Sequence, residues 1–204
     1  MCAQRFDYLA VARHVLQDEA TSLLALIASL GETFSEACEL IRNSQGRIVF
    51  CGVGQSWHVG RKTACSMASL GKPAFYVHAT EAIHGDMGLI TDADVVILIS
   101  HSGETKETLG VLGPVKRIGA KTIAIVGNPQ STLARECDIA LTTGVKQEGG
   151  PIKFAPSSSA LVTTGLGDAL VMAIAVSLGF TQEDYSRSHP GGAIGQQLLG
   201  KDAM

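Results

Sequence analysis

The sequence has 204 residues, of which 46% are hydrophobic and 17% charged, and its formal net charge is −3. This length and apolar content suit one globular domain, residues 1–204, with a sizeable core. The slightly acidic balance, without a basic cluster or an aromatic platform for bases, argues against a nucleic-acid partner.

The five cysteines are scattered and form no C-x-x-C pair, so we expect reduced, mostly buried thiols of a cytoplasmic protein. Charged residues at helical spacing near the N-terminus do not fit a signal peptide. The apolar stretch 160–180 is long enough to span a membrane, but Asp168 lies in its middle and no Lys or Arg flanks it. It is predicted to be a buried core helix, with no membrane partner.

Residues 1–44 are predicted to form two helices before any strand. Leucines at every seventh position from Leu9 to Leu30 indicate an amphipathic helix that ends at Gly31. A second, shorter helix is expected over residues 33–43. This helical hairpin could cover a sheet edge or a partner subunit, and the sequence leaves both open.

Short apolar runs alternate with helical segments over residues 45–200, which predicts an α/β core. Five strands are expected, over residues 47–51, 74–78, 94–100, 121–127 and 138–142. Helices are expected over residues 58–70, from 103 onward, over 131–136 and over 157–178. Gly110, Gly113 and Pro114 are predicted to loosen or kink the helix from 103. The predicted fold is a three-layer, doubly wound sheet of five parallel strands with right-handed crossovers.

Hydroxyl groups gather directly after the third predicted strand, in Ser100-His101-Ser102-Gly103-Glu104-Thr105. Ser102 is a good N-cap, and the three residues after it would form the first turn of the next helix. Unpaired N–H groups and the helix dipole attract an anion there, so a phosphate group is the expected ligand. The alternative, that Ser102 only caps a helix, stays open.

A second polar turn follows the first strand, in Gly52-Val53-Gly54-Gln55-Ser56. Gly54 would let the backbone approach a ligand, and Ser56 adds a hydroxyl. Both polar loops lie at strand carboxyl ends, where doubly wound sheets bind ligands. The dinucleotide fingerprint fails at Trp57 and at His78, and no Gly-Lys-Ser/Thr motif is present. One phosphorylated small molecule is therefore favoured over NAD or ATP.

Acid–base candidates lie in three places. His84 and His189 each sit in a glycine-rich polar loop, which more often positions chemistry than builds core. Glu107 would lie one turn beyond Ser102, close to a ligand whose phosphate is held there. A carboxylate and histidines around a carbonyl are the minimum for proton transfer. The spacing is not that of metal ligands, and no metal site is predicted.

Several stretches together resemble the SIS (sugar isomerase) domain family. The 100–105 loop is similar to its phosphate loop. Closer similarity to the arabinose-5-phosphate isomerases of the KpsF/GutQ type lies in G-V-G-Q-S-W-H-V-G-R-K, H-A-T-E-A-I-H-G-D-M-G, A-P-S-S-S-A and S-H-P-G-G-A-I-G.

The resemblance implies a flavodoxin-like five-stranded sheet, a homotetramer, no organic cofactor, and interconversion of arabinose 5-phosphate and ribulose 5-phosphate through an enediol. It places His84, Glu107 and His189 at catalytic positions. It places phosphate contacts at Ser100, His101, Ser102 and Thr105, with Ser56 nearby. Many members carry a tandem CBS pair after this domain, and the sequence ends where that pair would begin.

The sequence departs from the family motif at two positions. Gln55 stands where the family has lysine, and Trp57 replaces a small residue and would narrow the pocket mouth. Lys153 stands where a small residue is expected, and we hypothesise that it supplies the missing charge. The neutral Gln55 keeps two alternatives open beside the enzyme: a non-catalytic sugar-phosphate sensor, and an isomerase of another sugar phosphate. A structural scaffold is a third.

Overall fold

The computed structural model describes residues 6–189. One five-stranded sheet forms its centre, with strand order β2-β1-β3-β4-β5 and parallel pairing throughout. The strands are β1 (Ile48–Gly52), β2 (Ala74–His78), β3 (Val95–Ser100), β4 (Lys121–Val126) and β5 (Ile139–Thr142). Each lies within one residue of its predicted position.

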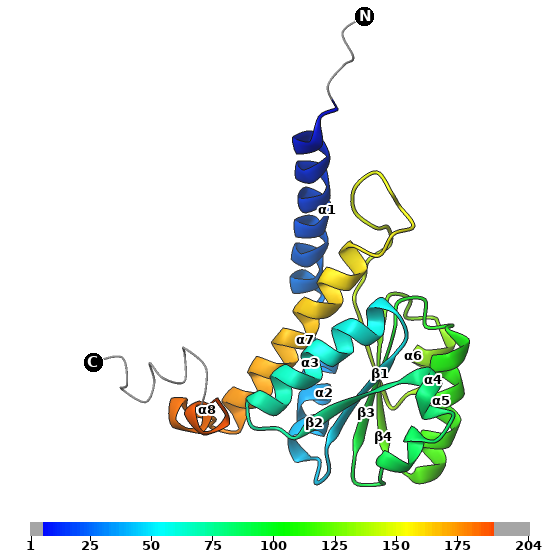
Figure 1. Ribbon diagram of the computed structural model, residues 1–204, viewed down its shortest axis with the longest axis vertical. Helices are drawn as coiled ribbons and strands as arrows, with labels where there is room; N and C mark the ends of the chain where they lie inside the picture. The colour runs from blue at the N-terminus through cyan, green and yellow to red at the C-terminus, as the bar shows by residue number, and fades with distance from the viewer. Residues whose placement is uncertain (1–5, 190–204) are drawn as a thin grey trace, which may run out of the picture.

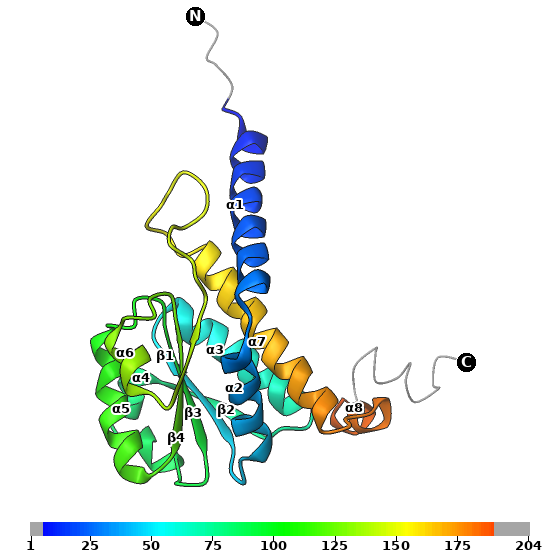
Figure 2. The ribbon, with the colours of Figure 1, turned by 180° about the vertical axis from the view of Figure 1, so that it is seen from behind.

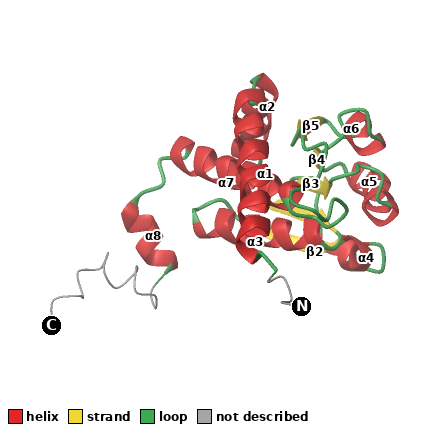
Figure 3. Cartoon of the chain, turned by 90° about the horizontal axis from the view of Figure 1, so that it is seen from above, coloured by secondary structure: helices red, strands yellow, loops and turns green. Residues whose placement is uncertain are grey.

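Helices cover both faces of the sheet (Figure 1). They are α1 (Tyr8–Ser29), α2 (Glu32–Asn43), α3 (Gln55–Ser69), α4 (Ala79–Ala82), α5 (Lys106–Ile118), α6 (Thr132–Glu136), α7 (Ser158–Ser177) and α8 (Gln182–Ser188), with a 3-10 turn at Asp86–Leu89. Helices α2, α3 and α7 lie on one face, and α4, α5 and α6 lie on the other (Figures 2 and 3). The doubly wound α/β class is confirmed.

The strands are buried on both faces, as their continuous apolar runs predict. In β3, Ile97 packs into the core under α2, α3 and α7, whereas Val96 and Leu98 pack into the core under α4, α5 and α6. Each such side chain is fully buried and contributes about 1.5–3 kcal/mol of hydrophobic stabilisation. The two cores fix the sheet, and with it the edge where the strands end.

Helix α7 is the long apolar helix that the sequence predicts. It packs against α3 and α1, and its Asp168 pairs with Lys62 of α3. Among the described residues it alone has the length and hydropathy of a membrane span, and half of that stretch is buried inside the protein. The packing therefore supports the predicted core helix.

The two helices of the N-terminal hairpin differ in what they cover. Helix α2 packs against β5 and α7, and so it covers the sheet. Helix α1 stands out beyond the α/β body and leans on α7 (Figure 1). Leu26 is its buried contact, but Leu9, Leu16 and Leu24 are more than 60% exposed. An apolar helix surface of this kind is available to a partner.

The predicted start of the helix after β3 is wrong. Helix α5 begins at Lys106 with Thr105 as N-cap, so Ser102 does not cap it. The reason is Gly103, whose φ of +68° makes a separate turn closed by a bond from its N–H to the Ser100 carbonyl (3.0 Å). The helix also runs unbroken to Ile118 with Pro114 inside it.

The thiols of the described residues are free, and they differ in exposure. Burial raises the pKa of Cys51 to about 12, whereas Cys65 is exposed. Because the thiolate is the reactive form, Cys65→Ser is expected to remove one fast-reacting thiol in a titration with a disulfide reagent. Cys51→Ser is expected to leave the fast phase unchanged. Loss of the fast phase in Cys51→Ser would contradict the expectation that Cys65 reacts faster than Cys51.

Candidate functional site

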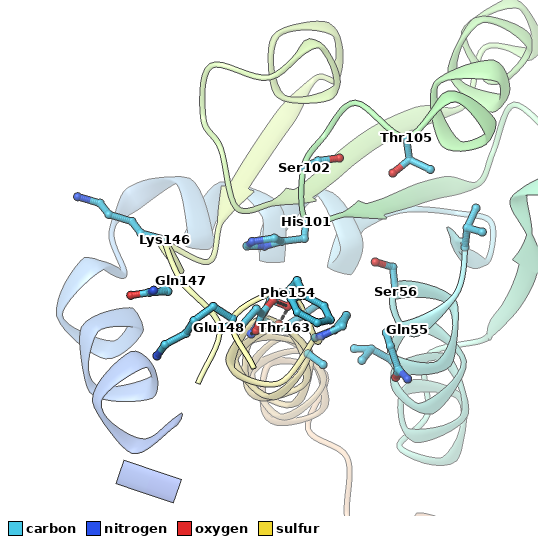
Figure 4. Close-up of a pocket in the computed structure, with 16 residues that line it drawn as sticks. Gln55, Ser56, His101, Ser102, Thr105, Lys146, Gln147, Glu148, Phe154 and Thr163 are labelled. Atoms are coloured by element: carbon cyan, nitrogen blue, oxygen red, sulfur yellow. Dashed lines mark hydrogen bonds between the residues drawn. The ribbon is translucent and has the colours of Figure 1, made fainter. Parts of the chain in front are cut away.

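A pocket of about 560 Å³ opens at the carboxyl edge of the sheet, between the ends of β1 and β3. The start of α3 and the 100–105 loop form one part of its wall. The loop that joins β5 to α7, residues 143–157, and the start of α7 form the rest (Figure 4). This is the crevice where the strand order reverses, as the sequence predicts.

Six of the residues predicted to bind substrate line this pocket. They are Gln55, Ser56, His101, Ser102, Thr105 and Lys153. Two others, Gly54 and Ser100, do not line it: Gly54 is the exposed residue directly before Gln55, and Ser100 is buried at the end of β3. Ser100 is 3% exposed, and its hydroxyl lies 2.8 Å from the Thr105 hydroxyl and accepts the Gly103 N–H at 3.1 Å. It thereby holds the loop closed.

Backbone hydrogen bonds fix the 100–105 loop to α6 and to the end of β4. The Gly103 carbonyl accepts the Leu133 N–H (3.1 Å), and the His101 carbonyl accepts the Gly127 N–H (2.8 Å). The Glu104 carboxylate accepts the Thr132 N–H at the start of α6 (2.7 Å), and this bond lowers the pKa of Glu104. Glu104 is therefore an anchor of the loop and not part of the pocket wall.

Two helices begin at the pocket without a side-chain cap. Gly54 is the N-cap of α3 and has no side chain, and the Thr105 hydroxyl at the start of α5 bonds to Ser100 instead. Gly54 has a φ of +58° and open space where a Cβ would stand. Uncapped helix starts with hydroxyls beside them leave N–H groups that can bind an anion.

Glu148 is a pocket residue to which sequence reasoning gave no role. Its carboxylate accepts the N–H groups of Ser157 (2.9 Å) and Ser159 (3.0 Å), and so it caps α7 from the 143–157 loop. Burial raises the pKa of Glu148, but the bonds from Ser159 and Ser157 and the nearby His101 together lower it. Within the described part of the pocket wall it is the one carboxylate.

The two lysines of the pocket wall differ in their partners. The Lys153 ammonium lies 3.3 Å from the Asp18 carboxylate of α1. The Lys146 side chain extends away from the other labelled side chains (Figure 4). Lys153 thus lies at the pocket, as hypothesised, in an ion pair with α1.

Trp57 does not narrow the pocket mouth. Because α3 begins at Gln55, two helical steps of about 100° turn Trp57 to the opposite side of the helix. Its ring packs against the edge strand, with centroids 5.9 Å from Tyr76 and 5.5 Å from His78, and the Arg61 guanidinium lies over its face.

The three predicted catalytic residues are not part of the pocket wall in the described chain. His84 follows α4 and Glu107 lies near the start of α5; both are exposed, and α4 and α5 pack together. Glu107 is two residues beyond Thr105. The His189 ring lies 3.2 Å from the Ser69 hydroxyl and stacks on Tyr185.

The position of His189 has a direct geometric consequence. Ser69 is the last residue of the 15-residue helix α3, whose first residue reaches the pocket. A helix of this length separates its ends by about 21 Å. His189 therefore lies far from the pocket of its own chain.

The fold and the pocket define a doubly wound α/β protein with a small-molecule site at the switch point of a parallel sheet. More narrowly, the chain belongs to the SIS domain family, whose profile matches residues 40–173.

Its relatives include enzymes named arabinose 5-phosphate isomerase KdsD. The chain is 45% identical over 197 residues to that of Pseudomonas aeruginosa, and 43% identical over 194 residues to that of Escherichia coli K12. These alignments cover 97% and 95% of the chain but 60% and 59% of the relatives, so the chain spans about three fifths of their length.

A solved structure is also similar over its whole length. A protein of E. coli CFT073, solved in complex with arabinose 5-phosphate, superposes with a TM-score of 0.88 at 37% identity. The match covers 92% of this chain and 100% of that one.

Proposed function

We propose that the protein is a sugar-phosphate aldose–ketose isomerase that interconverts arabinose 5-phosphate and ribulose 5-phosphate. The observation that carries this proposal is the pocket between two uncapped helix starts, with the hydroxyls of Ser56, Ser102 and Thr105 on its wall. It occurs in a chain similar to enzymes named for that reaction and to a structure solved with the aldose phosphate bound.

The pocket supports a simple division of labour. The hydroxyls and N–H groups hold the phosphate, and that binding energy orients the reacting carbons. A base removes the C2 proton of the open-chain aldose, and the resulting enediol is protonated at C1 to give the ketose. The proposed base is Glu107, with His84 and His189 moving the oxygen-bound protons. Glu148 is left out of the proton transfers because its carboxylate caps α7 through the Ser157 and Ser159 N–H groups.

We propose that the protein is a homo-oligomer, namely a tetramer, and the position of His189 supports an oligomer. If His189 takes part in the reaction, it serves the pocket of a second copy, since its own pocket lies at the other end of α3. The exposed apolar side chains on α1 and α7, such as Leu16, Leu24, Met172 and Val176, offer a surface for that copy. We further propose that the enzyme acts in the cytoplasm without an organic cofactor.

Incubation with a panel of sugar phosphates in heavy water tests the function. Deuterium at C1 or C2 of arabinose 5-phosphate or ribulose 5-phosphate is expected. The alternative is a non-catalytic sugar-phosphate sensor, which the neutral Gln55 favours. Sugar phosphates that bind without exchanging would establish the sensor, and exchange in another sugar phosphate alone would change the substrate.

The Lys153 hypothesis makes a separate prediction. Lys153→Ala is expected to lower kcat/KM by about tenfold or more, because it removes a positive charge at the pocket. Lys146→Ala is the matched control, since that side chain extends away from the pocket hydroxyls (Figure 4). Steady-state kinetics on both variants decides the matter, and equal effects would refute the hypothesis.

A further inference from the structure

The 143–157 loop is held from two sides. On one side, Glu148 bonds to the start of α7. On the other side, the loop meets Asp18 of α1, more than 130 residues away in sequence. One Asp18 oxygen accepts the Gly150 N–H at 2.9 Å and lies 3.3 Å from the Lys153 ammonium and 3.4 Å from the His14 ring.

The backbone of the loop is also packed directly on α1. A Cβ at Gly149 would lie 3.2 Å from the Asp18 Cβ. Gly150 has a φ of +73°, and a Cβ there would collide with Val15. The contact therefore requires glycine at position 150 and leaves little room for a side chain at position 149, and the bond to Asp18 fixes the position of Gly150.

The contacts of Gly149 and Gly150 also constrain Glu148, the residue before them in the sequence. Glu148 precedes Gly149 directly, and the Gly149 N–H bonds to the Ser157 hydroxyl (2.9 Å). The segment from 148 to 150 thus bridges α1 and the start of α7. A shift of Gly150 would move Glu148 within the pocket wall.

We propose that Asp18 is a positioning residue: its bond to the Gly150 N–H holds the 148–150 segment and sets the place of Glu148 in the pocket. The effect on turnover rests on the proposed isomerase function, whereas the effect on the loop does not. Helix α1, most of which lies exposed beside the α/β body, thereby becomes part of the architecture of the site.

Two measurements on the full chain test this role. Asp18→Ala is expected to speed amide hydrogen exchange at Gly150 by about tenfold. It is also expected to lower kcat by about tenfold, because Glu148 and Lys153 of the loop line the pocket in which the sugar must be oriented. A merely structural fault would lower the active fraction without speeding exchange in this loop.

Two further variants make the test specific. Asp18→Asn keeps an oxygen that can accept the Gly150 N–H, so it is expected to retain most of the exchange protection and most of kcat. Glu19→Gln removes the same charge one residue along α1, with no bond to the loop among the described residues, and is expected to behave as wild type.

The outcomes separate the two proposals. Unchanged exchange at Gly150 in Asp18→Ala overturns the inference, as do equal losses in Asp18→Ala and Asp18→Asn. If the loop loosens but kcat is unchanged, the positioning role is refuted. If wild type shows no isomerisation at all, the proposed function fails, and the exchange data alone decide whether Asp18 holds the loop.

Discussion

Glu107→Gln is expected to abolish isomerisation while sugar-phosphate binding persists. The amide has nearly the same shape but cannot take up the C2 proton, and loss of a general base costs about 10²- to 10⁴-fold in rate. The measurement is deuterium incorporation from heavy water into arabinose 5-phosphate, beside the dissociation constant of the same sugar by calorimetry. Glu107 lies outside the pocket wall, so that constant should change little.

Two other carboxylates serve as comparisons for Glu107. Glu136 of α6 bonds to Lys116 at 2.9 Å, away from the pocket, so Glu136→Gln is expected to keep full activity. Glu148→Gln removes the charge from the pocket wall. If Glu107→Gln exchanges deuterium at the wild-type rate and Glu148→Gln does not, the role of base belongs to Glu148 and the assignment to Glu107 is wrong.

Gly103→Ala is expected to be the most damaging single added methyl group in the pocket loops. The φ of +68° is strained for alanine, which costs about 1–3 kcal/mol, and the new Cβ would collide with Ser131. Because Gly103 lies between Ser102 and Thr105, the relaxation should misplace both hydroxyls. We expect a lower melting temperature and at least about tenfold weaker binding of inorganic phosphate.

Gly88→Ala is the matched control for Gly103→Ala. Gly88 lacks a positive φ and has open space around its Cβ position, so the substitution should change neither stability nor phosphate binding. Wild-type phosphate affinity in Gly103→Ala, measured below its melting temperature, would show that the loop does not bind the phosphate.

The five strands could be located from sequence because each is a short apolar run buried on both faces. Val96, Ile97 and Leu98 alternate between two cores, and no polar residue interrupts them. The switch-point pocket followed from the same pattern, since its two polar loops come directly after neighbouring strands. The start of α5 was misplaced because Ser102 fits the N-cap preference, whereas the φ of Gly103 decides where the turn lies.

The hydrogen-bond partners of charged side chains could not be predicted from such local patterns. Glu148 could be seen in a loop, but its bonds to Ser157 and Ser159 form only because the loop folds back onto the start of α7. A carboxylate some ten residues before a serine-rich helix start is a weak signal. Trp57 was misjudged for a related reason, because one turn of helix decides whether a side chain faces a pocket or a strand.

By itself, then, the sequence determined the doubly wound sheet, the hydroxyl-rich loops at its carboxyl edge and the family to which they belong. These depend on hydrophobic periodicity and turn chemistry, which act over a few residues. The tertiary structure alone decided that Asp18 meets Gly150, that Glu148 caps α7, and that His189 lies at the far end of α3. These contacts join residues up to 132 positions apart, and their geometry depends on how helices pack rather than on any local pattern.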